Sequence, residues 1–460
     1  METIIGRDQK DREIYGKRGV ILIGKNLVGD GEDAHLTTDV FLDVARPHVM
    51  TVCGKRGEGK SYSIGIIAEG LQTLPDEIRN KLCTIVIDTQ GIFWTMKTPN
   101  EKDIMALREW NQPPVGFRAA VYVPEGQTKA FTDAGVDYDG SFSFAPSELT
   151  GEDWLSVFGL EATEPLGTLL QMVLGRMSRG YAIADMVSQA RAEEGFESEK
   201  KTLEGMLRNA AGWGIFGSSR MPPLLVPGKL SVMDFSLTPQ NVRALMLAII
   251  GRRIFAERTA SRRKEELAEM EFFGEARVPI PWILVDEAHN FVPSDEATPS
   301  SEMLNKIVKE GRQPGISVVF ATQRPMKLHP DVLSQCDIII SHRLTAEEDV
   351  DSLKSIMQTY MLFDIAKYLN ELPKLKGVAI VLDDNSERIY KIRMKPRHDC
   401  RGEHGFRLDY FDVFRRRADR GQQERGRHPV RWRFYKHRQS VRFRRQQRDS
   451  RSCRQEQRGR

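Results

Sequence analysis

The stretch HVMTVCGKRGEGKSYSIGIIAEGL, residues 48–71, joins a short apolar run to a longer helical pattern through a turn that contains three glycines. The apolar run before the turn favours a buried strand, and the pattern after it favours a helix. Glycines allow a tight turn to expose its backbone N–H groups, and the N-terminus of a helix attracts anions. The stretch therefore predicts a strand, a phosphate-binding turn and a helix.

The turn fits the pattern G-x-x-x-x-G-K-[ST] through Gly54, Gly59, Lys60 and Ser61. In a loop of this kind the lysine reaches the β- and γ-phosphates of a nucleotide, and the hydroxyl group holds Mg²⁺. The alternative is a glycine-rich turn without a ligand. The residues that we expect to bind the nucleotide are Gly54, Lys55, Arg56, Gly57, Glu58, Gly59, Lys60 and Ser61, with Ser61 also a Mg²⁺ ligand.

A second motif, PWILVDEAHNF, places two carboxylates after the apolar run 282–285. We expect Asp286 to hold Mg²⁺ through water and Glu287 to act as the general base that polarises the attacking water. Adjacent acids at a strand end are otherwise solvated side chains. A glutamate base points to ATP-hydrolysing enzymes in which one further strand lies between the loop strand and the acidic strand.

Two later strand ends supply further candidates. The run SVVFATQRP ends with Gln323, which could sense the γ-phosphate, and IIISHRL brings Arg343 to the end of another strand. A planar, permanently charged guanidinium there could complete the site of a neighbouring subunit as an arginine finger. The alternatives are a satisfied loop amide at Gln323 and a surface salt bridge between Arg343 and an acid in residues 347–349. Arg312 is a second candidate for the finger.

Apolar runs alternate with helical patterns along most of the chain, which predicts an α/β fold with a mostly parallel sheet covered on both faces. We expect a small β element in residues 1–46 and an ATPase domain in residues 47–396. Strand patterns vanish at about residues 150–214, which indicates a helical insertion. The runs GVAIVLD and YKIRMK predict an antiparallel hairpin that closes the domain.

Charge is distributed unevenly. Residues 397–460 carry 21 Lys and Arg against 8 Asp and Glu, whereas the whole chain has a net charge of +4. The lack of apolar periodicity predicts that this tail is disordered; it is either a nucleic-acid-binding arm or a frame-shifted terminus. The five cysteines form no CxxC pair, no apolar run approaches the roughly 18 residues of a membrane span, and no signal peptide is evident, so we expect a cytoplasmic protein.

Taken in order, the motifs RPHVMTVCGKRGEGKSYSIG, IVIDTQGIFW, LSVMDFS, WILVDEAHNF, GRQPGISVVFATQRP and IIISHRLTAEED resemble those of the HerA-like ATPases of the HerA/FtsK superfamily. The resemblance covers roughly residues 35–396. It implies a RecA-like P-loop fold, Mg²⁺-dependent ATP hydrolysis, and a hexameric ring that translocates duplex DNA. It also implies roles for individual positions: hydrolysis by Lys60, Ser61, Asp286 and Glu287, sensing by Gln323, action across the subunit interface by Arg343, and a place near the nucleotide for Asp88.

The chain departs from this family in its N-terminal region. Only 53 residues precede the glycine turn, so the β-barrel of the best-known members must be reduced, which argues against a docked nuclease partner. Glu58 also occupies a loop position that is more often Ser or Thr.

Competing functions are a nucleotide-switched scaffold, and an ATPase subunit of a defence or secretion complex that could act on protein. Glu287 favours hydrolysis over a pure switch. The basic stretch 252–266 is either a DNA contact or the solvated end of a helix.

Overall fold

A computed structural model describes residues 2–29, 33–178, 180–271, 278–344, 346–356, 372–373 and 375–400. All of them lie within one compact unit, residues 1–402. The predictions made for the tail beyond residue 400 fall outside the described residues. None of the helices in the described part of the chain combines the length and the hydropathy that a membrane span requires.

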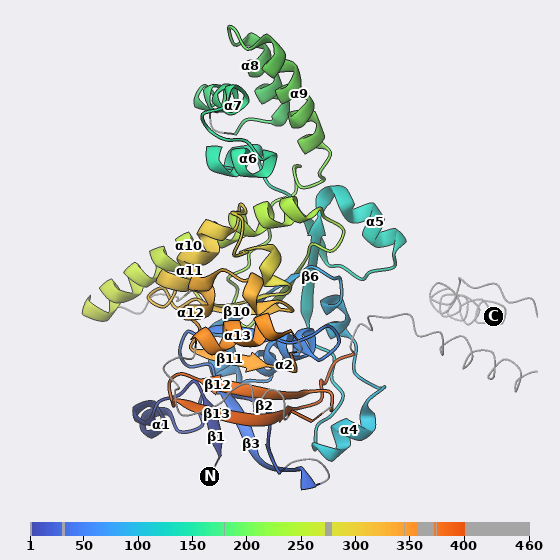
Figure 1. The fold of residues 1–460 in the computed structure, drawn as a ribbon, viewed down its shortest axis with the longest axis vertical. Helices are drawn as coiled ribbons and strands as arrows, with labels where there is room; N and C mark the ends of the chain where they lie inside the picture. Colours follow the sequence, from blue (N-terminus) through green and yellow to red (C-terminus); the bar gives the residue numbers. More distant parts are fainter. Residues whose placement is uncertain are drawn as a thin grey trace, which may run out of the picture. The chain divides into compact units, whose positions relative to one another are not determined.

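Thirteen strands of the described chain form one sheet in the order β1-β3-β2-β13-β12-β11-β4-β10-β9-β5-β8-β6-β7 (Figure 1). The strands are β1 Thr3–Ile5, β2 Val20–Val28, β3 His35–Asp43, β4 Val49–Cys53, β5 Leu82–Asp88, β6 Ala119–Pro124, β7 Gly140–Phe142, β8 Leu230–Asp234, β9 Ile280–Val285, β10 Ser317–Thr322, β11 Ile338–Ser341, β12 Val378–Asp383 and β13 Arg388–Met394. The helices are α1 Gln9–Tyr15, α2 Lys60–Gln72, α3 Asp76–Arg79, α4 Ile104–Glu109, α5 Thr128–Asp133, α6 Gly151–Phe158, α7 Pro165–Gly175, α8 Ile183–Ala192, α9 Glu197–Ala211, α10 Gln240–Glu271, α11 Ser301–Glu310, α12 Pro330–Ser334 and α13 Glu347–Ile356.

The strands from β11 to β7 in sheet order run parallel to one another. Strand β10 lies between the loop strand β4 and the acidic strand β9, as the glutamate base predicts. Strands β12 and β13 form the predicted antiparallel hairpin. The α/β fold with a mostly parallel sheet is therefore confirmed.

Both faces of the sheet are covered, because successive side chains of a strand point to opposite faces. In β9, Trp282 and Leu284 belong to the apolar core that contains the residues of α2. Ile283 and Val285 belong to a second core, formed with α10, α11 and the helices α6 to α9. The continuous apolar run in this strand thus fills two cores.

The predicted helical insertion corresponds to helices α6 to α9, which form one green group in Figure 1. Helix α9 contacts both α7 and α8. The apolar side chains of Leu169, Leu170, Leu203 and Leu207 are completely buried. The insertion therefore has an apolar interior that is continuous with the second core of the sheet.

The N-terminal strands do not form the separate element that the sequence predicts. Strand β2 pairs with β13 through Asn26 and Ile392, so β1, β2 and β3 extend the central sheet at its antiparallel edge. The sequence did not predict the pairing of β2 with β13, since β13 lies more than 350 residues further along the chain.

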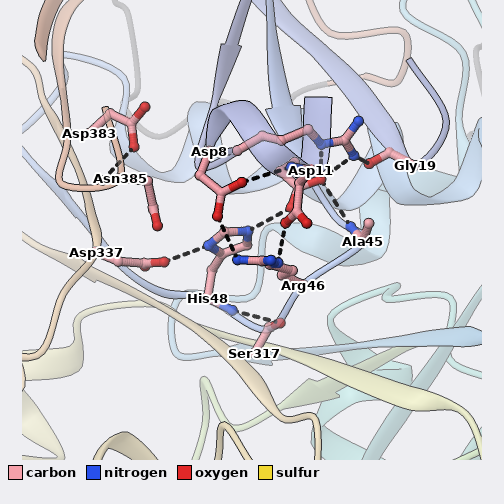
Figure 2. Close-up of polar contacts among 12 residues, drawn as sticks. Asp8, Asp11, Gly19, Ala45, Arg46, His48, Ser317, Asp337, Asp383 and Asn385 are labelled. Atoms are coloured by element: carbon pink, nitrogen blue, oxygen red, sulfur yellow. Dashed lines mark hydrogen bonds and ion pairs between the residues drawn. The ribbon is translucent and has the colours of Figure 1, made fainter. Parts of the chain in front are cut away.

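A buried polar cluster fastens these strands to the parallel part of the sheet. Figure 2 shows His48 beside Asp337, with its Nδ1 2.6 Å from Asp337 Oδ2. The Nε2 of the same ring lies 3.4 Å from Asp43 Oδ2, so His48 contacts two carboxylates. Arg7 donates to Asp43 and to the carbonyl oxygen of Gly16 at 2.7 Å. Burial by itself lowers the pKa of His48, but the hydrogen bonds and charges of the two carboxylates raise it to about 9. The imidazole is therefore a cation held by two acids.

Residues Lys395–Cys400, here called the C-terminal strap, cross helix α2. Arg397 donates to the completely buried carboxylate of Glu69 at 3.0 Å, and Lys395 reaches the same carboxylate at 3.3 Å. The guanidinium of Arg397 fits here because residue 65 is glycine: a Cβ at Gly65 would lie 2.3 Å from its central carbon. Arg397 to Cys400 were assigned to the tail in the sequence analysis. That boundary is wrong, because these residues belong to the packed body.

Candidate nucleotide site

The glycine turn follows strand β4, at the end of the sheet where the parallel strands have their carboxyl ends. Helix α2 begins directly after the turn, at Lys60. Gly54, Gly57 and Gly59 all have positive φ angles, of 156°, 85° and 122°. These are conformations that glycine adopts most easily. At Gly54 a side chain is also excluded by packing, because a Cβ would lie 2.6 Å from the Cβ of His342. The turn therefore has the backbone shape that a phosphate loop requires.

His342, the residue after β11, packs against Gly54 and Gly59 of the loop. Its Nδ1 donates to the carbonyl oxygen of Val378 at 3.0 Å, and its Nε2 accepts from the Ser63 hydroxyl at 2.8 Å. Burial lowers the pKa of His342 to about 4, so the ring is neutral, as this pair of hydrogen bonds requires. His342 was not among the residues predicted from the sequence, where it stands out only as a polar residue that follows Ser341 directly after an apolar run.

Lys60 is buried beneath the loop, with 5 % of its surface exposed. Its Nζ donates to the carbonyl oxygen of Lys55 at 3.3 Å. Burial lowers the pKa of Lys60, while the charges of Glu287 and Asp286 oppose this shift. The Ser61 hydroxyl donates to Asp286 Oδ1 at 3.4 Å. The structure thus brings the loop lysine and serine together with the two carboxylates that follow β9. Lys55, Arg56 and Gly57 are exposed at the loop's tip, with Glu58 half-buried beside them.

Asp286 and Glu287 are both buried, with 0 % and 6 % exposure. Burial raises the pKa of Asp286 to about 8, and the negative charges of Glu287 and Asp88 add to the effect. One oxygen of each carboxylate, Asp286 Oδ2 and Glu287 Oε2, is buried without a hydrogen-bond partner within the described residues. Such oxygens are costly to bury unless a ligand compensates them.

The donor set of Ser61 and Asp286 fits Mg²⁺, which in nucleotide sites takes one or two protein oxygens and completes its shell with phosphates and water. Across the described ranges no group of three or more His, Cys, Asp or Glu residues is arranged to hold a metal ion by itself.

Glu287 has an unusual backbone conformation, with φ of 50°. Its Oε1 accepts hydrogen bonds from the side-chain amides of Gln323 and Gln90, the latter at 2.9 Å. His289 lies nearby, with Nδ1 3.6 Å from Glu287 Oε2 and 3.1 Å from the Thr322 hydroxyl. Gln323, a candidate from the sequence, thus contacts the candidate base directly. Gln90 was not among the candidates, although it lies in the motif IVIDTQGIFW.

Arg343 lies directly beside its own glycine turn, because its carbonyl oxygen accepts from Lys55 N at 3.0 Å. Strand β11, which precedes Arg343, is not an edge strand of the sheet, since five more strands lie beyond it. Within the described residues no ion pair joins the half-buried side chain of Arg343 to the acids of residues 347–349.

Asp88 accepts hydrogen bonds from four successive backbone N–H groups, those of residues 90–93, at 2.7 to 2.9 Å. Its carboxylate therefore holds the backbone of the turn after β5. The resemblance implied only a place near the nucleotide for Asp88, and this structural role was not predicted.

The basic stretch 252–266 lies on α10, and several of its cations are occupied within the fold. Arg252 pairs with Asp153 at 2.6 Å, and the buried Arg258 donates to the carbonyl oxygen of Pro314 at 2.9 Å. Arg263 is exposed and, with Arg312, lines an open cavity of about 1060 Å³ between α10 and α11. Most of the stretch is thus engaged in the fold, and Arg312 lies away from the nucleotide loop.

With this geometry in view, comparisons with known proteins give a consistent result. Residues 265–389 match the family model described as helicase HerA-like C-terminal, a range that includes Glu287, Gln323 and Arg343. The resemblance to the HerA-like ATPases is confirmed. The DNA double-strand break repair helicase HerA of Pyrococcus furiosus is 27 % identical over 362 residues, which cover 74 % of this chain and 63 % of the relative. The protein of the same name from Sulfolobus acidocaldarius is 28 % identical over 108 residues, 24 % of this chain and 20 % of its own length.

Among solved structures, VirB4 of Thermoanaerobacter pseudethanolicus matches with a TM-score of 0.52 and 14 % identity, covering 82 % of this chain and 96 % of that chain. This likeness supports the RecA-like P-loop fold, which the HerA-like motifs imply. The chain spans 63 % of the length of the Pyrococcus HerA helicase.

Proposed function

We propose that this protein is a HerA-like motor that hydrolyses ATP and uses the energy to move duplex DNA, as a homo-oligomeric ring that we expect to be a hexamer. The observation that supports hydrolysis is the meeting of Lys60, Ser61, Asp286 and Glu287 at one end of the parallel sheet. DNA as the substrate rests on the similarity to two DNA double-strand break repair helicases, the HerA proteins of Pyrococcus furiosus and Sulfolobus acidocaldarius.

In the proposed mechanism the backbone of the turn 54–59 and the ammonium of Lys60 bind the phosphates of ATP. Ser61 and Asp286 would hold Mg²⁺, which neutralises charge on the phosphates when it is bound. Glu287 uses Oε2, which has no hydrogen-bond partner within the described residues, to accept a proton from the attacking water. Gln323 is the proposed sensor of the γ-phosphate, and its amide also contacts Glu287.

We propose that the guanidinium of Arg343 stabilises the charge on the phosphates of ATP during hydrolysis. Its backbone adjoins the turn of its own subunit. We retain the proposal that its side chain acts across a subunit interface in the ring, and its freedom from ion pairs within the described residues is consistent with that role.

The proposal is tested by measuring ATP binding and hydrolysis, with and without duplex DNA, for wild type, Lys60→Ala and Glu287→Gln. Lys60→Ala should lose binding and turnover. Glu287→Gln should still bind ATP and lose at least about 100-fold in kcat, because it keeps the shape of the base and removes its basicity. Wild-type turnover by Glu287→Gln would contradict the assigned base, and wild-type protein that binds ATP without turnover would favour a nucleotide-switched scaffold.

The particle mass of the same preparations tests the ring. DNA-stimulated hydrolysis would support DNA as the substrate, whereas a DNA-independent rate would favour the alternative of a secretion-type ATPase acting on protein.

A further inference from the structure

The turn after β5 is held rigidly without any help from the side chain of Gln90. The Asp88 carboxylate accepts from four backbone N–H groups of this turn. Arg243, from α10, donates to the carbonyl oxygen of Thr89 at 3.2 Å and to that of Ser236 at 2.7 Å. The side chains of Asp88 and Arg243 therefore hold the backbone of this turn. The side chain of Gln90 is not needed for that role.

That side chain reaches across to the neighbouring strand. Strand β9 has β5 on one side and β10 on the other, and all three run parallel with Val285 in register with Ile87 and Phe320. Gln90 follows the end of β5 and Gln323 follows the end of β10. A glutamine after each flanking strand thus reaches Glu287, the second residue after β9, and both amides donate to the same oxygen, Glu287 Oε1.

This arrangement makes the two oxygens of Glu287 different. Oε1 is anchored from both sides, whereas Oε2 is buried and has no hydrogen-bond partner among the described residues. The backbone of Glu287, with φ of 50°, is in a conformation that costs a non-glycine residue free energy and that persists where its surroundings enforce it. A single amide would leave the carboxylate free to rotate about its last torsion angle, which is soft. Two donors on opposite sides restrict that rotation.

We propose that Gln90 is a positioning residue for hydrolysis: together with Gln323 it holds the Glu287 carboxylate so that Oε2 faces the attacking water. This inference rests on the proposed ATPase function and adds to it Gln90, a residue that was not among the candidates from the sequence. Because a small misplacement of a catalytic group slows reaction far more than it weakens binding, loss of the Gln90 amide should affect kcat and spare nucleotide affinity.

The test compares Gln90→Leu with wild type in steady-state ATP hydrolysis. The variant should lose about 10-fold or more in kcat with KM for ATP within about twofold of wild type. The matched control is Gln189→Leu, which removes a glutamine amide that donates to Glu193 at 2.7 Å on helix α8, far from the nucleotide loop in sequence and structure. The control should keep wild-type kcat.

Two further variants test whether the effect depends on the reach of the amide and on the base itself. Gln90→Asn, one methylene shorter, should also fail to reach Glu287, and it replaces Gln90→Leu if the apolar variant does not fold. In a Glu287→Gln background, Gln90→Leu should cause no additional loss, because there is no longer a base to position.

The outcomes separate the two claims. Wild-type protein without any ATP turnover would overturn the proposed function and this inference with it. Wild-type turnover combined with an unchanged or increased kcat in folded Gln90→Leu and Gln90→Asn would overturn the inference alone, since an increase would mean that Gln90 restrains the base. A loss of kcat that persists undiminished in the Glu287→Gln background would also overturn it, because Gln90 would then act through some other group.

Discussion

Asp286 and Glu287 are adjacent in the chain but have different surroundings. The Glu287 carboxylate has two amide donors on one oxygen, whereas the side-chain hydrogen bond that Asp286 accepts from the Ser61 hydroxyl is long, at 3.4 Å. Asp286 is completely buried, and its neighbours Glu287 and Asp88 are acids. The ammonium of Lys60 offsets part of this negative charge, but burial and the two acids outweigh it and raise the pKa of Asp286 to about 8. An ionised carboxylate in such a place opposes folding until a cation or a proton neutralises it.

This contrast predicts that Asp286→Asn stabilises the nucleotide-free protein while removing its activity. The amide has nearly the same shape, carries no charge, and places an N–H donor among carboxylates. We expect the free energy of unfolding to rise by about 1 kcal/mol. Chemical denaturation without nucleotide or Mg²⁺ measures this, and Asp133→Asn, at an exposed acid on α5, is the control. A less stable Asp286→Asn would show that the carboxylate is satisfied in the free protein.

At this scale the motif spacing pointed to Lys60, Ser61, Asp286 and Glu287, because each is fixed relative to a strand end by local sequence. Gln90 could not be selected in the same way. Its importance depends on β5 lying next to β9, and strand order is a property of the whole sheet. His342 was missed for a similar reason, since its ring is placed under the turn only because β11 pairs with β4.

Among the elements, helix α2 connects the nucleotide loop with the C-terminal strap. It begins at the nucleotide loop, and its Glu69 receives both cations of the C-terminal strap, Lys395 and Arg397. Asp399 completes the cluster by pairing with Arg397. The sequence showed the strap only as the start of a basic region, because a buried arginine and an exposed one look the same in a charge count.

Glu69→Ala should therefore destabilise the protein by about 3 kcal/mol or more, since it removes the carboxylate that the buried Lys395 pairs with and leaves Arg397 paired with Asp399 alone. The matched control is Glu204→Ala, which removes a glutamate that also pairs with two arginines, Arg191 and Arg208, but does so at the surface of the helical insertion. Surface ion pairs contribute little to stability, so the control should unfold almost as wild type does. Equal effects of the two substitutions in thermal unfolding would contradict the strap's structural role.

At the scale of the whole molecule, the cluster around His48 joins the N-terminal strands to the parallel sheet (Figure 2). The pKa of His48 rises from 6.5 to about 9 on folding. A raised pKa contributes stability that is complete below the unfolded value and is lost as the pH rises through the folded value. The contribution of His48 should therefore decline between about pH 6.5 and pH 9.

The measurement is the free energy of unfolding as a function of pH for wild type and His48→Gln. Across this window wild type should lose on the order of 3 kcal/mol more than the variant. His35→Gln, at an exposed histidine of β3, is the control and should follow the wild-type curve. Parallel curves for wild type and His48→Gln would show that the histidine is not charged in the folded protein.

Strand β4, described above as the carrier of the nucleotide turn, also constrains the order in which the chain can acquire structure. Both of its neighbours in the sheet, β10 and β11, are made more than 260 residues later during synthesis. Until the ribosome has released them, β4 has two unpaired edges and an apolar surface on each face. Pairings between such distant segments form slowly, and exposed strand edges promote association between chains. Nascent or truncated chains that stop before β10 should accordingly depend on chaperones and aggregate when they are produced alone.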